Sequence, residues 1–187
     1  GMIDLIHEFI PEGERYTFVD YVDDDGMGNG PIKLKLEIYR EGETVYLDWT
    51  GTDDQVEGTV NFLLNEEMFK MFTGVFLIMA FDPLLTFNDG YYDLFEVNLP
   101  KGSVVQPEFP AALGNRLPMM ARQFDVLQAT FSKLIDGFSV AGSYGTSPNL
   151  VYAGTDSEGN DFQMLEILYG GIPARPGGDG LDGHSWW

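Results

Sequence analysis

The 187-residue sequence has a globular composition, with 44% hydrophobic and 14% aromatic residues. Its 10 Lys and Arg residues against 30 Asp and Glu residues give a formal net charge of −20, which disfavours binding to nucleic acids and to anionic membrane surfaces. The absence of cysteine excludes disulfides, thiolate metal sites and a Cys nucleophile, and it is compatible with a cytoplasmic protein. The length suits a single domain over residues 1–187 or a fragment of a larger subunit, and Gly1 before Met2 is interpreted as tag-derived.

Strand patterns dominate the first third of the chain. A strand is predicted over residues 15–19, and apolar residues alternate with charged ones over residues 31–39 (PIKLKLEIY). The same alternation returns over residues 44–50 (TVYLDWT), so these two segments are expected to pair as a hairpin. A further short strand is predicted over residues 57–62.

Two principal helices are predicted. Asn65 is expected to cap a helix that runs to about Phe81, where Asp82-Pro83 stops it. This helix is apolar nearly all round, which indicates an element covered on several sides. The second helix is expected to open at Pro118 and to end at Gly137. Its apolar stripe consists of Met120, Phe124, Leu127, Phe131 and Leu134.

The remaining segments predict strands and loops. Residues 91–97 are strand-like, and further short strands are predicted over residues 138–141, 150–153 and 162–168, the last two split by the turn TDSEGN. The tail from Gly170 is too rich in glycine and proline for regular structure. The sequence therefore predicts a mixed α+β domain with mostly antiparallel strands and two principal helices.

Residues 19–30 (VDYVDDDGMGNG) combine four aspartates with three glycines and an asparagine. Counted from Asp20, an EF-hand pattern fails, because Val22 interrupts the ligands, Asp25 stands at the glycine position and no glutamate stands at the twelfth position. Asp-Gly and Asn-Gly pairs supply the positive φ angles of tight turns, and aspartates bind the free amides there. The segment is therefore predicted to be a hydrogen-bonded turn.

The only metal candidates are three residues near the C-terminus. Asp179, Asp182 and His184 place two carboxylates and an imidazole within six residues, a set that can contribute to a hard-metal site. The alternative is a plain glycine-rich loop. No nucleophile elbow, P-loop or dinucleotide-binding glycine motif is present.

Arginine is scarce in this acidic chain, so Arg116, Arg122 and Arg175 stand out. Arg116 and Arg175 lie in predicted loops, where functional groups concentrate. Either can clamp a carboxylate or a phosphate with two parallel hydrogen bonds. The alternative is that each satisfies loop carbonyls and nearby aspartates.

Four strings occur in an order and spacing that resemble one family. They are IPEGERYTFVDYVDDDG, DWTGTDDQVEGTVN, FNDGYYDLFEVNLPKGSVVQPEFPAALGNR and GGIPARPGGDGLDGHS. Together they resemble the hydantoinase B/oxoprolinase family, which includes the large (alpha) subunits of acetone and acetophenone carboxylases. The resemblance covers the chain from about Ile10 to Ser185.

The resemblance implies a cytoplasmic, oligomeric, multisubunit enzyme that depends on ATP and uses a divalent metal. Members of the family open cyclic amides such as hydantoins and 5-oxoproline, or carboxylate ketones. The nucleotide is expected mainly on a partner subunit or domain of the hydantoinase A type. The histidine and aspartate motifs of the family's N-terminal half have no counterpart here, so no catalytic residue is carried over and catalysis by the isolated chain is not expected.

The leading hypothesis is therefore a C-terminal-half fragment of such a large subunit, which shapes the substrate chamber and docks partner subunits. The polar loop that contains Asp53 and Asp54, the NDG turn at residues 88–90 and the loop around Arg175 are the surfaces expected to do this. The alternative is a noncatalytic α+β binding or structural module that keeps the family fold.

Overall fold

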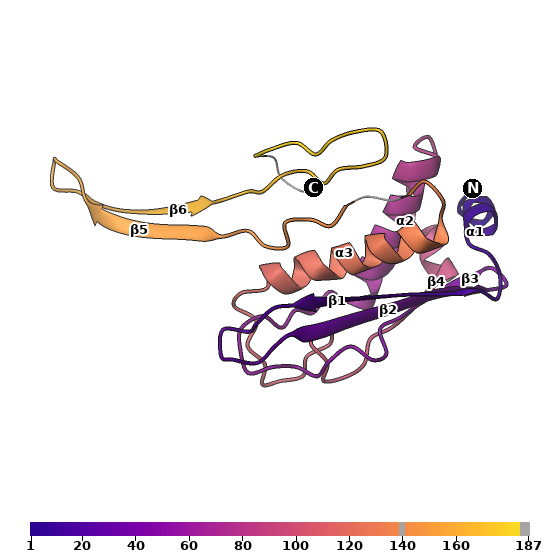
Figure 1. The fold of residues 1–187 in the computed structure, drawn as a ribbon, viewed down its shortest axis with the longest axis horizontal. Coiled ribbons are helices and arrows are strands. Elements are labelled where there is room, and N and C mark those ends of the chain that lie inside the picture. The colour runs from indigo at the N-terminus through magenta and orange to yellow at the C-terminus, as the bar shows by residue number, and fades with distance from the viewer. Residues whose placement is uncertain (139–140, 184–187) are drawn as a thin grey trace.

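The computed structural model describes residues 1–138 and 141–183. One sheet forms the base of the molecule, helix α3 lies across it, and the C-terminal segment runs over α3 on the side away from the sheet (Figure 1). The elements are α1 (Met2–Phe9), β1 (Arg15–Val22), β2 (Ile32–Glu41), β3 (Thr44–Asp48), α2 (Glu66–Phe81), the 3₁₀ helix η1 (Asp89–Leu94), β4 (Phe95–Asn98), α3 (Leu117–Leu134), β5 (Asn149–Thr155) and β6 (Asp161–Ile167).

The main sheet has four strands in the order β1-β2-β3-β4. The pairs β1–β2 and β2–β3 are antiparallel and β3–β4 is parallel, which confirms the predicted hairpin and the mixed α+β class. Alternate residues of β2 are buried because one face of the sheet lies under α3, as the alternating sequence predicts. The buried side chains of β2 include Ile32, Leu34, Leu36 and Ile38.

Helix α2 has the predicted limits. The Asn65 side chain accepts a hydrogen bond from the backbone N–H of Met68 (2.9 Å), and the helix ends before Asp82. Its environment differs from the expectation, because one face is buried while the other apolar residues are half-buried or exposed, with Met79 71% exposed. A Cβ on Gly74 would lie 2.3 Å from the Tyr91 ring, so the glycine lets η1 pack closely against α2.

Helix α3 confirms the second helical prediction. It begins at Leu117, one residue before Pro118, and it ends at Leu134, three residues before Gly137. The predicted stripe faces the core, since Leu127 and Phe131 are completely buried.

Two predicted strands are absent where the structure can be described. Residues 57–62 form turns because the buried Asn61 side chain bonds the backbone of Val56, Gly58 and Ala112, which replaces strand pairing. A strand is also predicted over residues 138–141. Residues 138 and 141 are irregular, and residues 139–140 lie outside the described residues.

The strand-like residues 91–97 divide between η1 and β4. The Asn88 side chain accepts the backbone N–H of Gly90 (3.0 Å) and so caps η1 before the strand begins.

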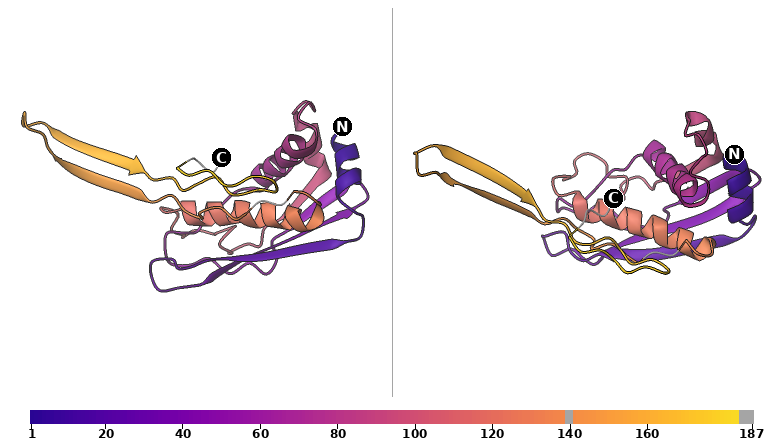
Figure 2. Two further views of the ribbon diagram at one scale, coloured as in Figure 1. Left: turned by 45° about the horizontal axis from the view of Figure 1, so that its top comes forward. Right: turned by 90° about the horizontal axis from the view of Figure 1, so that it is seen from above.

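Strands β5 and β6 form a separate antiparallel hairpin, here called the arm, that projects away from the body in all three ribbon views (Figures 1 and 2). This confirms the two strands predicted around TDSEGN. After the arm the chain returns over α3 as an irregular segment, as the glycine and proline content predicts. Ile172 and Leu181 pair across this segment through two backbone hydrogen bonds.

Candidate functional site

A partly buried ion-pair network joins β1, α3 and the segment that follows α3. The Arg122 guanidinium lies 2.8 Å from a carboxylate oxygen of Asp20 and 3.3 Å from one of Asp125. Asp125 also accepts hydrogen bonds from the backbone N–H and the hydroxyl of Ser143, at 3.0 and 2.9 Å. Because the Asp125 side chain is only 8% exposed, these contacts are weakly screened and hold the three segments together.

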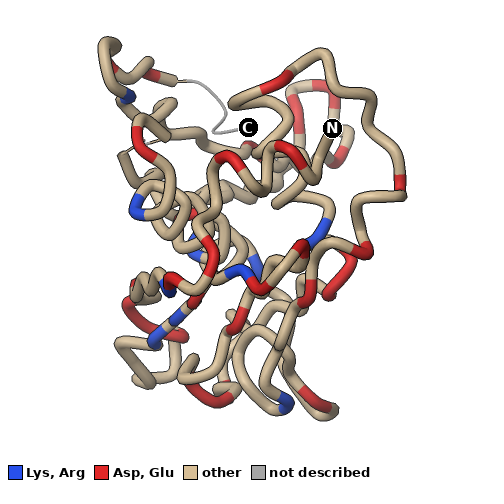
Figure 3. The backbone as a smooth tube through the Cα atoms, turned by 90° about the vertical axis from the view of Figure 1, so that its right-hand side faces the viewer, with Lys and Arg blue, Asp and Glu red and all other residues tan. Residues whose placement is uncertain are grey.

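A first hollow of about 560 Å³ lies on the β1 side of this network. Its wall contains the carboxylates of Asp20, Asp23 and Asp24, which lie beside Arg122 and Tyr144. Acidic positions are spread along the backbone (Figure 3), and the sequence has 30 Asp and Glu residues against 10 Lys and Arg residues. The first hollow contains three carboxylates, and its one arginine, Arg122, is already paired with Asp20 and Asp125. It therefore disfavours phosphate groups and does not fit a nucleotide.

A second hollow of about 420 Å³ lies between α3 and the returning C-terminal segment. Its walls are mainly apolar, and it is lined by Phe124, Phe138, Ile172, Pro173 and Pro176. Asp125 and Ser143 also reach it, so the ion-pair network separates the two hollows.

Two further polar side chains line the second hollow, those of Gln128 and Arg175. Neither side chain makes a hydrogen bond or an ion pair within the described part of the chain. An apolar cavity with a few converging polar groups is the usual form of a small-molecule site.

The acidic turn is held by Asp25. One of its carboxylate oxygens accepts the backbone N–H groups of Met27 and Asn29, and the other accepts the Asn29 side chain and the N–H of Gly58. The Asn29 side-chain amide, together with these backbone N–H groups, holds the pKa of the Asp25 carboxyl at about 2. Asp25 is therefore a structural residue, and the hydrogen-bonded turn is present.

The four residues predicted to contact substrate or subunits do not meet in one place. Asp53 accepts the backbone N–H of Lys33 (2.8 Å) and pairs with its ammonium (3.5 Å), so it ties a loop to β2. Asp54 is exposed beside Ser103, and Arg116 is exposed at the start of α3. Of the four, Arg175 lines the second hollow. Their functional roles stay predictions.

The predicted metal group stays a prediction as well. Asp179 and Asp182 are exposed in the returning segment, and His184 lies outside the described residues. Among residues 1–138 and 141–183, no group of three His, Asp or Glu side chains lies close enough to hold a metal ion.

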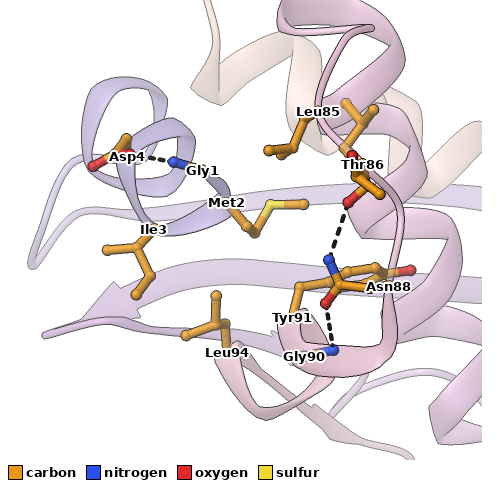
Figure 4. A pocket seen from close by; sticks show the side chains of 11 residues that line it. Gly1, Met2, Ile3, Asp4, Leu85, Thr86, Asn88, Gly90, Tyr91 and Leu94 are labelled. Carbon is orange, nitrogen blue, oxygen red and sulfur yellow. Dashed lines mark hydrogen bonds and ion pairs between the residues drawn. The ribbon is translucent and has the colours of Figure 1, made fainter.

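The NDG turn borders a third hollow, between α1 and the loop after α2 (Figure 4). The Asn88 side-chain amide donates to the Thr86 carbonyl (3.0 Å), in addition to the cap of η1. Burial raises the pKa of the neighbouring Tyr91 hydroxyl, which donates to the Met71 carbonyl (3.3 Å). Because this hollow is also lined by Gly1, interpreted as tag-derived, it is a weaker candidate than the second hollow.

Sequence reasoning missed two parts of this surface. Asp125 and Gln128 belong to a helix whose apolar stripe predicts only how it packs on the core, so the stripe carries no information about these polar positions. The arm was predicted as strands, but every residue of β5 and β6 is exposed. The sequence contains a sign that the arm differs from the strands of the main sheet, because large apolar residues occur on both faces of the hairpin. Tyr152 and Met164 pair on one face, and Val151 and Leu165 pair on the other.

Comparison with known proteins gives a consistent result. The family model for hydantoinase B/oxoprolinase matches residues 2–187. A putative D-/L-hydantoinase subunit from Pseudomonas sp. (strain NS671) is 24% identical over 92% of this chain, and the 5-oxoprolinase of Dictyostelium discoideum is 28% identical over 87%. The chain spans 30% and 12% of the lengths of these two relatives.

One solved structure has the same fold. The ATP-dependent caprolactamase from Pseudomonas jessenii superposes with a TM-score of 0.77 at 20% sequence identity, over 98% of this chain and 32% of that one. None of the helices in the described part of the chain is long and apolar enough to span a membrane.

Proposed function

Because the chain belongs to the hydantoinase B/oxoprolinase family, we propose that it forms part of the large subunit of an ATP-dependent enzyme that opens cyclic amides. In this proposal the second hollow shapes one wall of the substrate chamber. The observation that carries the proposal is that hollow itself, whose apolar walls and free Gln128 and Arg175 side chains suit a small ring with one amide.

Ring opening is favoured over ketone carboxylation by the chemistry of the named relatives. Hydantoin, 5-oxoproline and caprolactam each contain an amide bond within a ring. A side-chain amide such as Gln128 can donate to the ring carbonyl and accept from the ring N–H at once, whereas a ketone offers only an acceptor.

The acidic first hollow disfavours phosphate groups, and the described residues contain no group of three His, Asp or Glu side chains that could hold a metal ion. We place the nucleotide on a partner of the hydantoinase A type. One of the relatives is itself named as a subunit, which supports the existence of such a partner. A nucleotide on that partner would supply the phosphoryl group for activating the amide oxygen, and this chain would contribute a wall that positions the ring.

The arm supports the second half of the proposal, that this chain makes subunit or domain contacts. A two-stranded hairpin with apolar side chains on both faces is marginal on its own, so it gains stability by packing against another surface. An arm variant with Val151→Asp and Leu165→Asp should lose association with the hydantoinase A-type partner, whereas Glu43→Gln, at an exposed position in the β2–β3 turn, should keep it.

Saturation-transfer NMR on the 187-residue chain tests the chamber proposal, because it detects weak ligands. We expect 2-pyrrolidinone, hydantoin and caprolactam to receive saturation and acetone to receive none. Gln128→Leu should reduce the transfer, and the matched change Gln163→Leu, at an exposed arm residue, should not. Equal signals from acetone and the cyclic amides would contradict ring-amide recognition. Silence from every ligand would favour the alternative, a noncatalytic module that acts through the arm.

A further inference from the structure

Arg175 differs from most arginines of this chain, because it has no carboxylate partner among residues 1–138 and 141–183. Arg15, Arg40 and Arg122 each lie within 4.0 Å of a carboxylate oxygen. Arg175 makes no ion pair or side-chain hydrogen bond to any residue in the described ranges. A guanidinium with no partner among the described residues has five N–H donors for an added anion, which it attracts locally against the repulsion of the net charge of −20.

A tight turn at Arg175 places its guanidinium beside Gly178. Arg175 and Gly178 exchange two backbone hydrogen bonds of 3.0 Å, which close a tight turn. A Cβ on Gly178 would lie 3.2 Å from the central guanidinium carbon and 3.3 and 3.4 Å from its terminal nitrogens. The guanidinium therefore lies close to Gly178, over the place that a Cβ would occupy.

The second hollow next to Arg175 suits an apolar ligand body. Two aromatic rings, Phe124 and Phe138, contribute to its walls together with Ile172. The other charge at this hollow is Asp125, whose carboxylate is already bound by Arg122 and by Ser143. This pairing leaves the positive charge of Arg175 uncompensated at the edge of an apolar hollow.

We propose that the second hollow is a binding site for small organic acids, with the ligand carboxylate on Arg175 and its apolar ring between α3 and the returning segment. Arg175 forms two parallel hydrogen bonds with both carboxylate oxygens, the geometry that a guanidinium provides and an ammonium does not. This inference rests on the proposed function, which assigns cyclic amides to the second hollow. It adds that the preferred cyclic amides carry a carboxylate.

Two pairs of ligands that differ in the carboxylate test the inference on the 187-residue chain. The first pair is 5-oxoproline and 2-pyrrolidinone, the same five-membered ring amide with and without the acid. The second pair is cyclohexanecarboxylate and cyclohexanecarboxamide, which contain no ring amide. Titration followed by NMR gives a Kd for each, and we expect each acid to bind at least about tenfold more tightly than its neutral partner, because hydrogen bonds to charged groups are the stronger ones.

Three variants separate recognition by Arg175 from general charge. Arg175→Ala should weaken both acids about tenfold and leave the neutral ligands unchanged. Gly178→Ala keeps the charge but displaces the guanidinium, so it should weaken the acids partly. Lys101→Ala removes an exposed cation elsewhere on the surface that has no ion pair in the described residues, and it should change nothing. Thermal melting of each variant checks that the fold is kept.

The outcomes distinguish this inference from the proposed function. If the acids bind no better than the neutral ligands, or if Lys101→Ala matches Arg175→Ala, the carboxylate site is overturned while the ring-amide function can stand. If cyclohexanecarboxylate binds through Arg175 but no ring amide binds, the carboxylate site stands and the proposed function fails. If nothing binds to the folded chain, both fail.

Discussion

The hairpins β1–β2 and β5–β6 are closed by the same turn chemistry but lie in opposite surroundings. In each loop an aspartate accepts the backbone N–H groups two and four residues later through one oxygen, and the side chain of an asparagine through the other. Asp25 and Asn29 make this turn in the first hairpin, and Asp156 and Asn160 make it in the arm. Both follow the pattern D-x-x-G-N.

The difference between the hairpins begins beyond the turn. The Asp25 carboxylate also accepts the N–H of Gly58 (2.9 Å), and the inward side chains of β2 are buried under α3. In the arm, by contrast, every residue of both strands is exposed. A turn sequence therefore decides where the chain reverses, whereas burial of the hairpin depends on whether another element covers it.

The largest expected difference concerns leucines at the centre of each hairpin. Leu36 in β2 is completely buried, and Leu165 in the arm is 59% exposed. Leu36→Ala should lower the free energy of unfolding by about 2–5 kcal/mol, because it leaves a cavity in the core. Leu165→Ala should change it by no more than about 0.5 kcal/mol. Urea unfolding followed by circular dichroism measures both, and equal losses would show that the arm is covered within this chain.

The next effect concerns the contact that only the first turn makes with the body. A Cβ on Gly58 would lie 2.2 Å from the Asp25 carbonyl oxygen, a backbone atom that cannot move freely. Gly58→Ala should therefore cost about 1–3 kcal/mol of unfolding free energy through overpacking. Gly114→Ala is the matched control, because its Cβ would meet Thr59 at an ordinary 3.8 Å. If both changes are tolerated equally in urea unfolding, the turn is not locked by its contact with Gly58.

Local signals in the sequence predicted much of this fold, and contacts between distant segments account for what it missed. Alternation over residues 31–39 and the cap at Asn65 both depend on near neighbours, and both predictions are confirmed. The false strand over residues 57–62 has the opposite cause, since Asn61 bonds a carbonyl 51 positions away. No periodicity records such a contact.

The candidate site was less predictable for the same reason. Arg175 was singled out because arginine is scarce, but its hollow exists only because the returning segment passes over α3. Asp125 meets Ser143 across 18 positions of the sequence, and no short motif encodes that pairing.

Acid should weaken the first turn through Asp25. Its pKa is about 2 in the folded protein against 3.8 for the ordinary carboxyl, so the charged form is stabilised by folding. This contribution is complete above the unfolded pKa and is lost as pH falls through about 4 towards about 2. Asp25→Asn should be less stable at neutral pH, and its stability should vary less across that window. Urea midpoints at a series of pH values measure this, and parallel curves for the two proteins would contradict it.

The smallest expected effect tests whether the arm unfolds together with the body. Gly28 and Gly159 occupy the same position in the two turns, with φ angles of 89° and 87°, and a Cβ at either would meet no atom within 4 Å. Alanine at each position therefore carries the same left-handed strain, about 1 kcal/mol. Gly28→Ala should lower the free energy of global unfolding by about that amount. Gly159→Ala should leave it unchanged and instead speed hydrogen exchange of the β5–β6 amides, because an uncovered hairpin opens locally. If Gly159→Ala lowers global stability as much as Gly28→Ala, the arm belongs to the cooperative unit and its apolar faces do not need a partner to stay folded.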